Sequence, residues 1–343
     1  MTSVLFVQEY AHSFLSIQTN NSCAVFLFTV ANMLNFYIEQ LNEEIEIVSI
    51  AREVFVNHLQ FKYQDLRELS DIDLFNNNST KQICPSIEAF SDAKNKMKNR
   101  SESVPCWDHS RMKLANSAGS DYIHANWLSG YGSLKKFIAT QGPLKETVDD
   151  FLTLLWQNDC GIVVVLTQLL EDNVVKCYPY WATDVNECRI TDKFVVYTKK
   201  VMNRPHYVKY LLELRHSKAA KSRCLSLYHY TDWPENDTPK SIAHIIELIK
   251  TINKERVTKM NFNLACAPDP IVVHGSLGIG RTGTFCSIDL CFDYWLLEKQ
   301  IDVEGVVRYV RKMRHSSVSN EKQYVFIWRV LAEIINKHVT YQF

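Results

Sequence analysis

The stretch 271–285, which reads IVVHGSLGIGRTGTF, places a glycine-rich loop between two regular elements. Its first residues are apolar and β-branched, and they predict a short buried strand over 270–273. From residue 282 onward, apolar side chains recur at helical spacing, so a helix is expected to follow. The glycines let successive backbone N–H groups point inward at the positive end of that helix, and Arg281 adds two parallel donors. The loop is therefore expected to hold an anion.

The composition limits the class of protein. The 343 residues are 46% hydrophobic and 22% charged, as in ordinary globular proteins, so a sizeable core is available. Lys and Arg balance Asp and Glu at 38 each, so no overall field draws the chain to nucleic acid or to an anionic membrane. The ten cysteines include no Cys-x-x-Cys pair, which argues against a zinc module and fits a reducing compartment. No metal or organic cofactor is expected.

Residues 1–47 differ from the rest and are expected to form an N-terminal extension. Segment 23–38 is apolar, but it is short for a membrane span and contains Asn32 and Asn35. No basic region or cleavage site marks it as a signal peptide. The segment is predicted to be a helix that packs on the main domain, with a membrane anchor as the alternative.

A single α/β domain is predicted over 48–338, followed by a short tail at 339–343. Its most distinct strand is 161–166, which is unbroken and β-branched as in strands buried on both faces. Other strands, some of them alternating as antiparallel strands do, are expected at 121–128, 135–140, 193–201, 207–215 and 223–230. Helices are expected at 48–72, 87–98, 145–159, 241–256, 303–314 and 320–337. Together these elements indicate a mixed, twisted sheet flanked by helices.

The loop sequence His274-x-Ser-x-Gly-Ile-Gly-Arg-Thr-Gly283 resembles the phosphate-binding signature of the tyrosine-specific protein phosphatases. Further matches follow in family order: Lys98-Asn-Arg100, Asp108-His-Ser-Arg111, Ala139-Thr-Gln-Gly-Pro-Leu144, Lys176-Cys177, Tyr230-Thr-x-Trp-Pro234 and Gln323-Tyr324. The resemblance implies the fold of a cysteine-phosphatase domain. It also implies a phosphate loop made of Ser276, Leu277, Gly278, Ile279, Gly280 and Arg281.

The family's catalytic cysteine stands between this histidine and this serine, where the chain has Gly275. Cysteine phosphatases depend on a thiolate that forms a phosphocysteine intermediate, and glycine has no side chain to attack phosphorus. In another enzyme, deletion of the nucleophile costs about six orders of magnitude in turnover. The resemblance therefore predicts a phosphatase fold without phosphatase activity.

Three further functional positions depart from the family pattern. Ser101 replaces the tyrosine whose ring forms one wall of the phosphotyrosine slot, a loss of about 0.5–1.5 kcal/mol of ring contact. The motif Trp233-Pro234-Glu235 keeps the tryptophan but lengthens the family's general acid by one methylene, which misplaces its proton. Ser319 replaces the glutamine that positions the attacking water, whereas a second family glutamine is kept as Gln323.

The retained residues also have structural interpretations. The glycine loop with Arg281 either binds phosphate or only holds the turn from strand to helix. His274 is expected to be a satisfied buried histidine, and Trp107 a core residue. His124 replaces a usual asparagine at a packing or turn position that implies nothing catalytic. Two carboxylates on the helix after the loop are expected to pair with nearby basic side chains: Asp289 and Asp293.

Three functions are compatible with these residues. The first is a module that binds a phosphotyrosine-containing protein without turning it over. The second is an interaction protein that contacts its partner through an outer surface and whose pocket is vestigial. The third is a residual phosphatase that uses water directly, with Glu235 as the acid.

Residues 104–111 are similar to the tyrosine-phosphatase-like proteins encoded by polydnaviruses of parasitoid wasps. This resemblance implies expression in an infected insect host, in the cytoplasm of its cells. It also implies interference with host signalling or immune cells.

Overall fold

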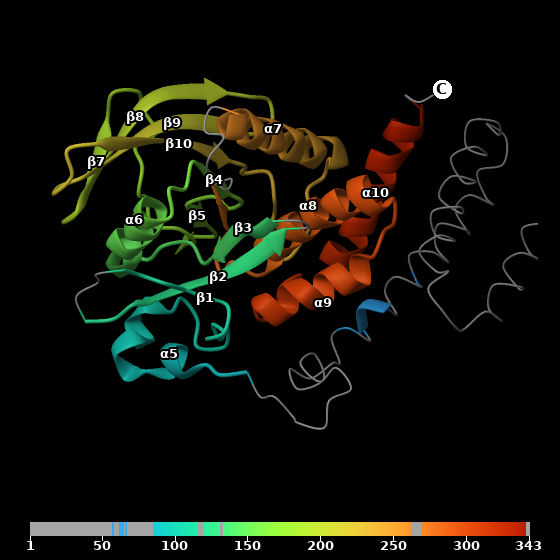
Figure 1. Cartoon of the computed structure of the whole chain (residues 1–343), viewed down its shortest axis with the longest axis horizontal. Helices are drawn as coiled ribbons and strands as arrows, with labels where there is room; N and C mark the ends of the chain where they lie inside the picture. The colour runs from blue at the N-terminus through green and yellow to red at the C-terminus, as the bar shows by residue number, and fades with distance from the viewer. Residues whose placement is uncertain are drawn as a thin grey trace, which may run out of the picture.

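The structure, a computed structural model, describes residues 57, 62–64, 66, 85–115, 119–130, 133–261 and 269–340. The predicted extension 1–47, its apolar segment 23–38 and most of the predicted helix 48–72 lie outside these residues. Within them, one twisted sheet is flanked by helices (Figure 1). The predicted α/β class is thus confirmed.

Nine strands form one mixed sheet: β1 (Arg111–Lys113), β2 (Tyr122–Gly130), β3 (Ser133–Thr140), β4 (Ile162–Val165), β7 (Cys188–Ile190), β8 (Phe194–Asn203), β9 (Val208–His216), β10 (Ser222–His229) and β11 (Ile271–His274). Their order is β1-β2-β3-β11-β4-β10-β9-β8-β7. The four central strands β3, β11, β4 and β10 run parallel, and all other neighbours are antiparallel. Every residue of β4 and β11 is buried, as predicted for central parallel strands.

Helices cover both faces of this sheet: η2 (Lys145–Thr147) and α6 (Val148–Gln157) on one, and α7 (Ile242–Asn261), α8 (Gly280–Glu298), α9 (Val303–Met313) and α10 (Glu321–Thr340) on the other (Figure 1). Successive side chains of a strand point to opposite faces. Accordingly Val272 joins the core under α6, whereas Ile271 and Val273 join the core under α7 to α10. The strand that leads into the glycine loop is therefore fixed from both sides.

Some predicted boundaries were wrong. The predicted helix 87–98 is two pieces, α5 (Glu88–Ser91) and η1 (Ala93–Lys98), because Asp92 is extended and its carboxylate caps η1 by accepting the Lys94 N–H at 3.1 Å. α10 runs to Thr340, so the predicted tail is helical at its start. The strands β1, β7 and the hairpin β5 (Leu170–Glu171) with β6 (Val174–Val175) were not predicted, since two or three residues carry no readable periodicity.

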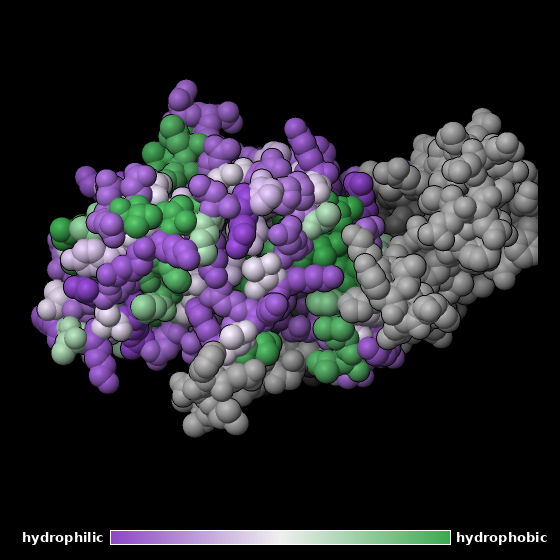
Figure 2. Space-filling model, turned by 90° about the horizontal axis from the view of Figure 1, so that it is seen from above, coloured by the Kyte–Doolittle hydropathy of each residue, from purple (hydrophilic) through white to green (hydrophobic). Residues whose placement is uncertain are grey.

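The described surface in Figure 2 is mostly hydrophilic, with separate hydrophobic patches. In the part of the chain that the structure describes, every helix is too short or too polar to cross a bilayer. The prediction made for segment 23–38 lies outside that part.

A buried charge cluster ties the sheet to α8. The Lys136 side chain on β3 is only 2% exposed, and its Nζ pairs with Asp289 and, at 2.5 Å, with Asp293. Burial alone would lower the pKa of Lys136, but the two carboxylates outweigh that effect and raise it. The side chain of Asn253 on α7 also donates to Asp289, at 2.5 Å. Both aspartates have the basic partner that the sequence led us to expect.

Replacing Lys136 by methionine is expected to lower the free energy of unfolding by about 3–5 kcal/mol, because two carboxylates then lose their buried cation. Chemical denaturation of the purified protein measures this change. The matched control is Asp293→Asn, whose side chain is 26% exposed and whose loss leaves the Lys136–Asp289 pair intact. We expect a smaller effect for the control, and equal losses would contradict the account.

Candidate functional site

The loop 275–279 leaves the carboxyl end of the central strand β11 and enters α8 directly. Gly278 has a φ of +72°, and a Cβ there would lie 2.0 Å from the carbonyl oxygen of Thr140 at the end of β3. Only glycine fits this position, because an L side chain would be strained and would also clash with backbone. The close approach of the loop to the neighbouring strand therefore depends on Gly278.

The carbonyl groups of the loop are hydrogen-bonded, whereas its N–H groups are not bonded to the described residues. Its carbonyl groups are held by neighbours: Gly142 N–H donates to Ser276 O at 2.8 Å, and Arg314 donates to Leu277 O at 3.0 Å and to Gly278 O at 2.5 Å. The N–H groups of residues 276–279 donate no hydrogen bond to the residues that the structure describes. Free amides at the start of a helix are the usual elements of an anion site.

Arg281, in the first turn of α8, is 6% exposed, and both of its terminal nitrogens are hydrogen-bonded. Its Nη1 and Nη2 donate to the two oxygens of Glu171 at 2.8 and 2.9 Å, and Nη1 also donates to Thr167 at 2.7 Å. Burial would raise the pKa of Glu171, but the hydrogen bonds and charge of Arg281 outweigh it, and the pKa lies below its ordinary value. Glu171 therefore fixes the plane of the guanidinium.

The remaining edge of Arg281 faces the predicted acid loop. Its Nε donates to Pro234 O at 3.3 Å, a long and replaceable contact. Sequence reasoning did not identify Thr167 and Glu171 as partners of this arginine. The nearest signal was the family match at Lys176-Cys177, which follows the hairpin that carries Glu171.

Gly275 is buried and has room around it. A Cβ built there would have Thr282 Oγ1 as its nearest neighbour at 3.6 Å, and then Arg281 Cβ at 3.8 Å, both ordinary contacts. The hydroxyl of Thr282 is fully buried and has no hydrogen-bond partner among the described residues. Gly275, where the family's nucleophile is missing, is thus bordered by unfilled space and by the unpaired hydroxyl of Thr282.

His274 is a satisfied buried histidine, as expected. Its Nε2 lies 2.9 Å from the hydroxyl of Tyr180, and its Nδ1 lies 3.2 Å from Gly275 O. Burial lowers the pKa of His274 to about 3, so the ring is neutral at physiological pH. It therefore supports the loop without adding a charge to it.

The acid loop is held against the site at several points. Trp233 is buried, and its indole N–H donates to Asp237 O at 2.9 Å. Glu235 is 41% exposed at its side chain and forms an ion pair with Lys176 at 2.6 Å. From α10, Lys322 pairs with Asp237 at 3.1 Å. With the contact of Pro234 to Arg281, these bonds bring the predicted acid loop and the glycine loop together.

Two residues near the start of α10 complete this side of the site. Gln323 Oε1 accepts the N–H of Ser319 at 3.0 Å and its hydroxyl at 3.2 Å. A Cβ on Gly280 would lie 2.6 Å from Ser319 Oγ and 3.0 Å from Gln323 Nε2. Both side chains thus lie directly against the end of the glycine loop.

The predicted substrate loop is fixed by Arg100 rather than by Ser101. The guanidinium of Arg100 donates to Gly142 O at 2.9 and 3.2 Å, and Gly142 in turn holds Ser276. Ser101 Oγ lies 2.8 Å from Ser103 Oγ and accepts the Ser103 N–H at 3.2 Å. The serine therefore turns back onto its own loop and leaves that side of the site without a ring.

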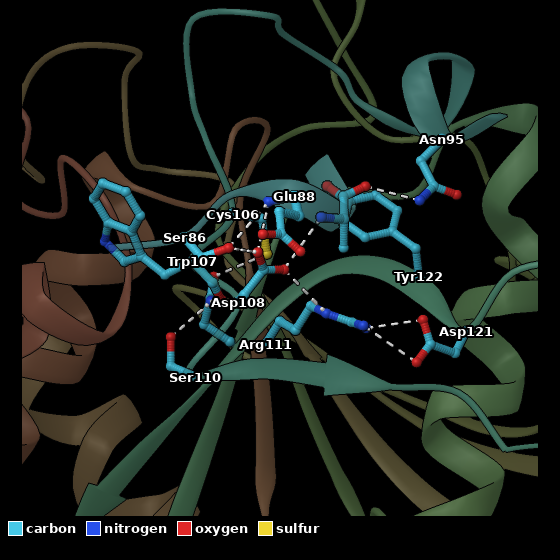
Figure 3. Close-up of polar contacts among 12 residues, drawn as sticks. Ser86, Glu88, Asn95, Cys106, Trp107, Asp108, Ser110, Arg111, Asp121 and Tyr122 are labelled. Atoms are coloured by element: carbon cyan, nitrogen blue, oxygen red, sulfur yellow. Dashed lines mark hydrogen bonds and ion pairs between the residues drawn. The ribbon is translucent and has the colours of Figure 1, made fainter. Parts of the chain in front are cut away.

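A polar network anchors the segments that flank the substrate loop (Figure 3). The carboxylate of Asp108 accepts from Ser86 Oγ at 2.5 Å and from Glu88 N–H at 2.6 Å. Arg111 bridges this carboxylate, at 3.4 Å, and that of Asp121, at 3.1 Å. The network consists of ion pairs and of hydrogen bonds that cap a helix start. It holds together the segments on both sides of the predicted substrate loop.

Cys106 and Trp107 belong to this structural region. Cys106 is fully buried, donates to Asn126 Oδ1 at 3.5 Å, and has its pKa raised by burial to about 11, so it is a protonated thiol. Trp107 is 4% exposed and donates to Arg311 O at 3.3 Å; its ring turns away from the network in Figure 3. Trp107 is a core residue, as predicted. Neither residue contributes a reactive group.

The two glycines of the loop give a matched test of this geometry. Gly278→Ala is expected to lower the free energy of unfolding by about 1–3 kcal/mol or more, because alanine is strained at a positive φ and its methyl group meets Thr140 O. Gly275→Ala is expected to be neutral or to stabilise by less than about 1 kcal/mol, because its methyl group fits. Denaturation curves of both variants measure this, and equal effects would contradict the geometry.

Comparison with known proteins agrees with this arrangement. The family model described as protein-tyrosine phosphatase matches residues 95–333. A probable tyrosine phosphatase protein N1 of Microplitis demolitor bracovirus is 37% identical over 236 residues, which are 68% of this chain and 74% of that protein. Human tyrosine-protein phosphatase non-receptor type 9 is 33% identical over 249 residues, which are 70% of this chain but only 42% of that protein.

Solved structures give the same result. The crystal structure of the catalytic domain of human protein tyrosine phosphatase non-receptor type 18 matches with a TM-score of 0.71 and 26% identity, over 81% of this chain and 96% of that one. The chain spans 10% of human receptor-type tyrosine-protein phosphatase zeta, with 35% identity. The family match, the bracoviral relative and the shared fold together show that the chain belongs to the protein-tyrosine phosphatase family.

Proposed function

We propose that this member of the family acts by binding a phosphotyrosine-containing protein and does not turn it over. The observation that carries the proposal is Gly275, a residue with no side chain in a loop whose anion-binding groups are otherwise in place. A phosphatase of this family needs a thiolate at that position to accept the phosphoryl group. A pocket without it holds a phosphate but has nothing that forms a bond with phosphorus.

Several features support retained phosphate binding. The free amides of residues 276–279 face no competing acceptor among the described residues, and Glu171 holds the Arg281 guanidinium in a fixed plane. Among the described residues, only the 3.3 Å contact to Pro234 O occupies the second edge of that guanidinium, so a phosphate can replace it. Loss of the thiolate also removes a negative charge that would repel an incoming dianion.

The acid also argues against turnover. Glu235 is paired with Lys176 at 2.6 Å, so its carboxyl group is held on the ammonium group of Lys176 instead of being free to reach a leaving oxygen. Ser319 is hydrogen-bonded to Gln323 and lacks the amide that the family uses to position water. A residual phosphatase that uses water directly is therefore the least favoured of the three functions.

The competing function is an interaction protein whose pocket takes no ligand. Ser101 favours it, because the serine bonds to Ser103 and provides no ring wall for a phosphotyrosine. In that case the partner binds an outer surface, and substitutions in the glycine loop leave its affinity unchanged.

The bracoviral relative supports a place of action in an infected insect host. We propose that the chain works in the cytoplasm of host cells, where a bound phosphoprotein is shielded from active phosphatases and from phosphotyrosine readers. The expected consequence is altered signalling, including that of immune cells.

Titration of the purified protein with a phosphotyrosine peptide and with its unphosphorylated twin tests the binding function. We expect at least tenfold tighter binding of the phosphorylated peptide, because charge-assisted bonds to a dianion are strong. Arg281→Lys is expected to remove most of this preference, since lysine lacks the planar fork. The control Arg215→Lys changes a half-exposed arginine on β9 and should bind like the wild type. Equal affinities of the wild type for both peptides would favour the interaction protein.

Gly275→Cys is expected to form a phosphocysteine, because a Cβ fits there at ordinary contact distances and the thiol would lie in a loop whose amides lower its pKa. An aryl phosphate should then release about one equivalent of phenol in a burst. Hydrolysis of the phosphocysteine should follow slowly, because Ser319 stands where the family has the glutamine that positions the attacking water. Stopped-flow absorbance and intact-protein mass spectrometry measure both steps. Gly275→Ser is the control and should give no burst. Wild-type turnover that disappears in Glu235→Gln would instead establish the residual phosphatase.

A further inference from the structure

The buried hydroxyl of Thr282 is unusual within its own helix. Oγ1 of Thr284, two residues later, donates to Gly280 O at 2.8 Å, which is the common bond of a helical threonine to the carbonyl four residues earlier. Thr282 is fully buried, yet its Oγ1 has no partner in the described part of the chain. A buried hydroxyl without a partner costs free energy, so it calls for an explanation.

The backbone acceptors that Thr282 would normally use already accept hydrogen bonds from other residues. Gly278 O, four residues earlier, accepts from Arg314 Nε at 2.5 Å. Ile279 O, three residues earlier, accepts both the Gly283 N–H at 2.9 Å and the Val318 N–H at 3.1 Å. These bonds hold the glycine loop in place. The threonine hydroxyl donates to neither carbonyl group and has no partner among the described residues.

The hydroxyl points toward the space at Gly275. Apart from residues 274 and 276, the atom nearest to a Cβ built on Gly275 is Thr282 Oγ1 at 3.6 Å, and the next are atoms of Arg281 at 3.8 and 4.0 Å. Any side chain at 275 would fill this space and cover the hydroxyl. With glycine there, this buried donor borders space that no side chain fills, and the loop amides at 276–279 donate no hydrogen bond to the described residues.

We infer that Thr282 is a ligand-binding residue of this chain, whose hydroxyl donates to a phosphate oxygen seated over Gly275. The phosphate sits deeper than a cysteine would allow and gains one donor that is already buried and directed. The inference rests on the proposed function, and its ligand class is the phosphate dianion of a phosphoprotein or free orthophosphate. A preorganised donor adds affinity because it loses little freedom on binding.

Two substitutions separate binding from packing. Thr282→Val keeps the shape and removes the donor, so affinity for the phosphotyrosine peptide should fall about tenfold. Its stability should be unchanged or raised, because an unsatisfied buried hydroxyl is lost. Thr282→Ser keeps the hydroxyl and should keep the affinity. Calorimetric titration and denaturation measure the two quantities on the same samples.

A double-mutant cycle with Gly275→Ala locates the effect. The added methyl group occupies the space between hydroxyl and ligand, so Thr282→Val should cost nothing further in that background. Additive losses would overturn the inference, as would a Thr282→Val protein with wild-type affinity or equal losses in Thr282→Val and Thr282→Ser.

Orthophosphate is the second probe and separates the inference from the proposed function. If the wild type binds orthophosphate but shows no preference for the phosphopeptide, the phosphoprotein function fails, and Thr282→Val should still weaken orthophosphate binding about tenfold. If the wild type binds neither probe, both proposals fail. If it binds either probe and Thr282→Val binds equally well, only the role of Thr282 fails.

Discussion

The site depends on one buried cation, Arg314. Its side chain is 1% exposed, faces no carboxylate at close range in the contacts described, and donates to Leu277 O, Gly278 O, Asn126 Oδ1 and His124 Nδ1 at 2.5–3.2 Å. Burial lowers the pKa of Arg314 to about 10, so it remains charged at neutral pH. Because the guanidinium binds the loop carbonyls, the loop amides of residues 276–279 donate no hydrogen bond to the described residues. A cation held on one face of the loop thus leaves the amides of the other face available to an anion.

His124 extends this arrangement to the predicted substrate loop and is a buried structural residue, in agreement with the expectation of a packing position. Its Nε2 lies 2.8 Å from Val104 O, and its Nδ1 lies 3.2 Å from Arg314 Nη2. Burial and the nearby Arg314 lower its pKa to about 3, so the ring is neutral. The tautomer with hydrogen on Nε2 satisfies both contacts at once. The histidine therefore links the backbone beside Ser103 to the arginine that holds the phosphate loop.

Strongly patterned elements were predictable from the sequence, and partner side chains were not. The apolar runs of β4 and β11 and the glycines before α8 each have a local cause, and the structure has them where they were expected. Glu171 lies in a hairpin of two-residue strands, too short for periodicity to reveal. Its pairing with Arg281 spans 110 residues of chain and is set only by the packed fold. The role of a residue can be predicted from the sequence when it depends on neighbours in the chain, but not when it depends on a partner brought close only by folding.

The departures from the family pattern share one property. Gly275, Ser101 and Ser319 lie in loops around the candidate site, and none of them is part of the hydrophobic core. Changes there are expected to cost little folding free energy, whereas Gly278 and Arg314 hold the loop in its conformation. A folded loop is therefore expected with or without a ligand, and its shape alone does not argue for binding. The unpaired hydroxyl of Thr282 is different, because it lowers stability and satisfies no group in the described chain. A purely structural role for the pocket leaves that hydroxyl without a reason, and a bound phosphate supplies one.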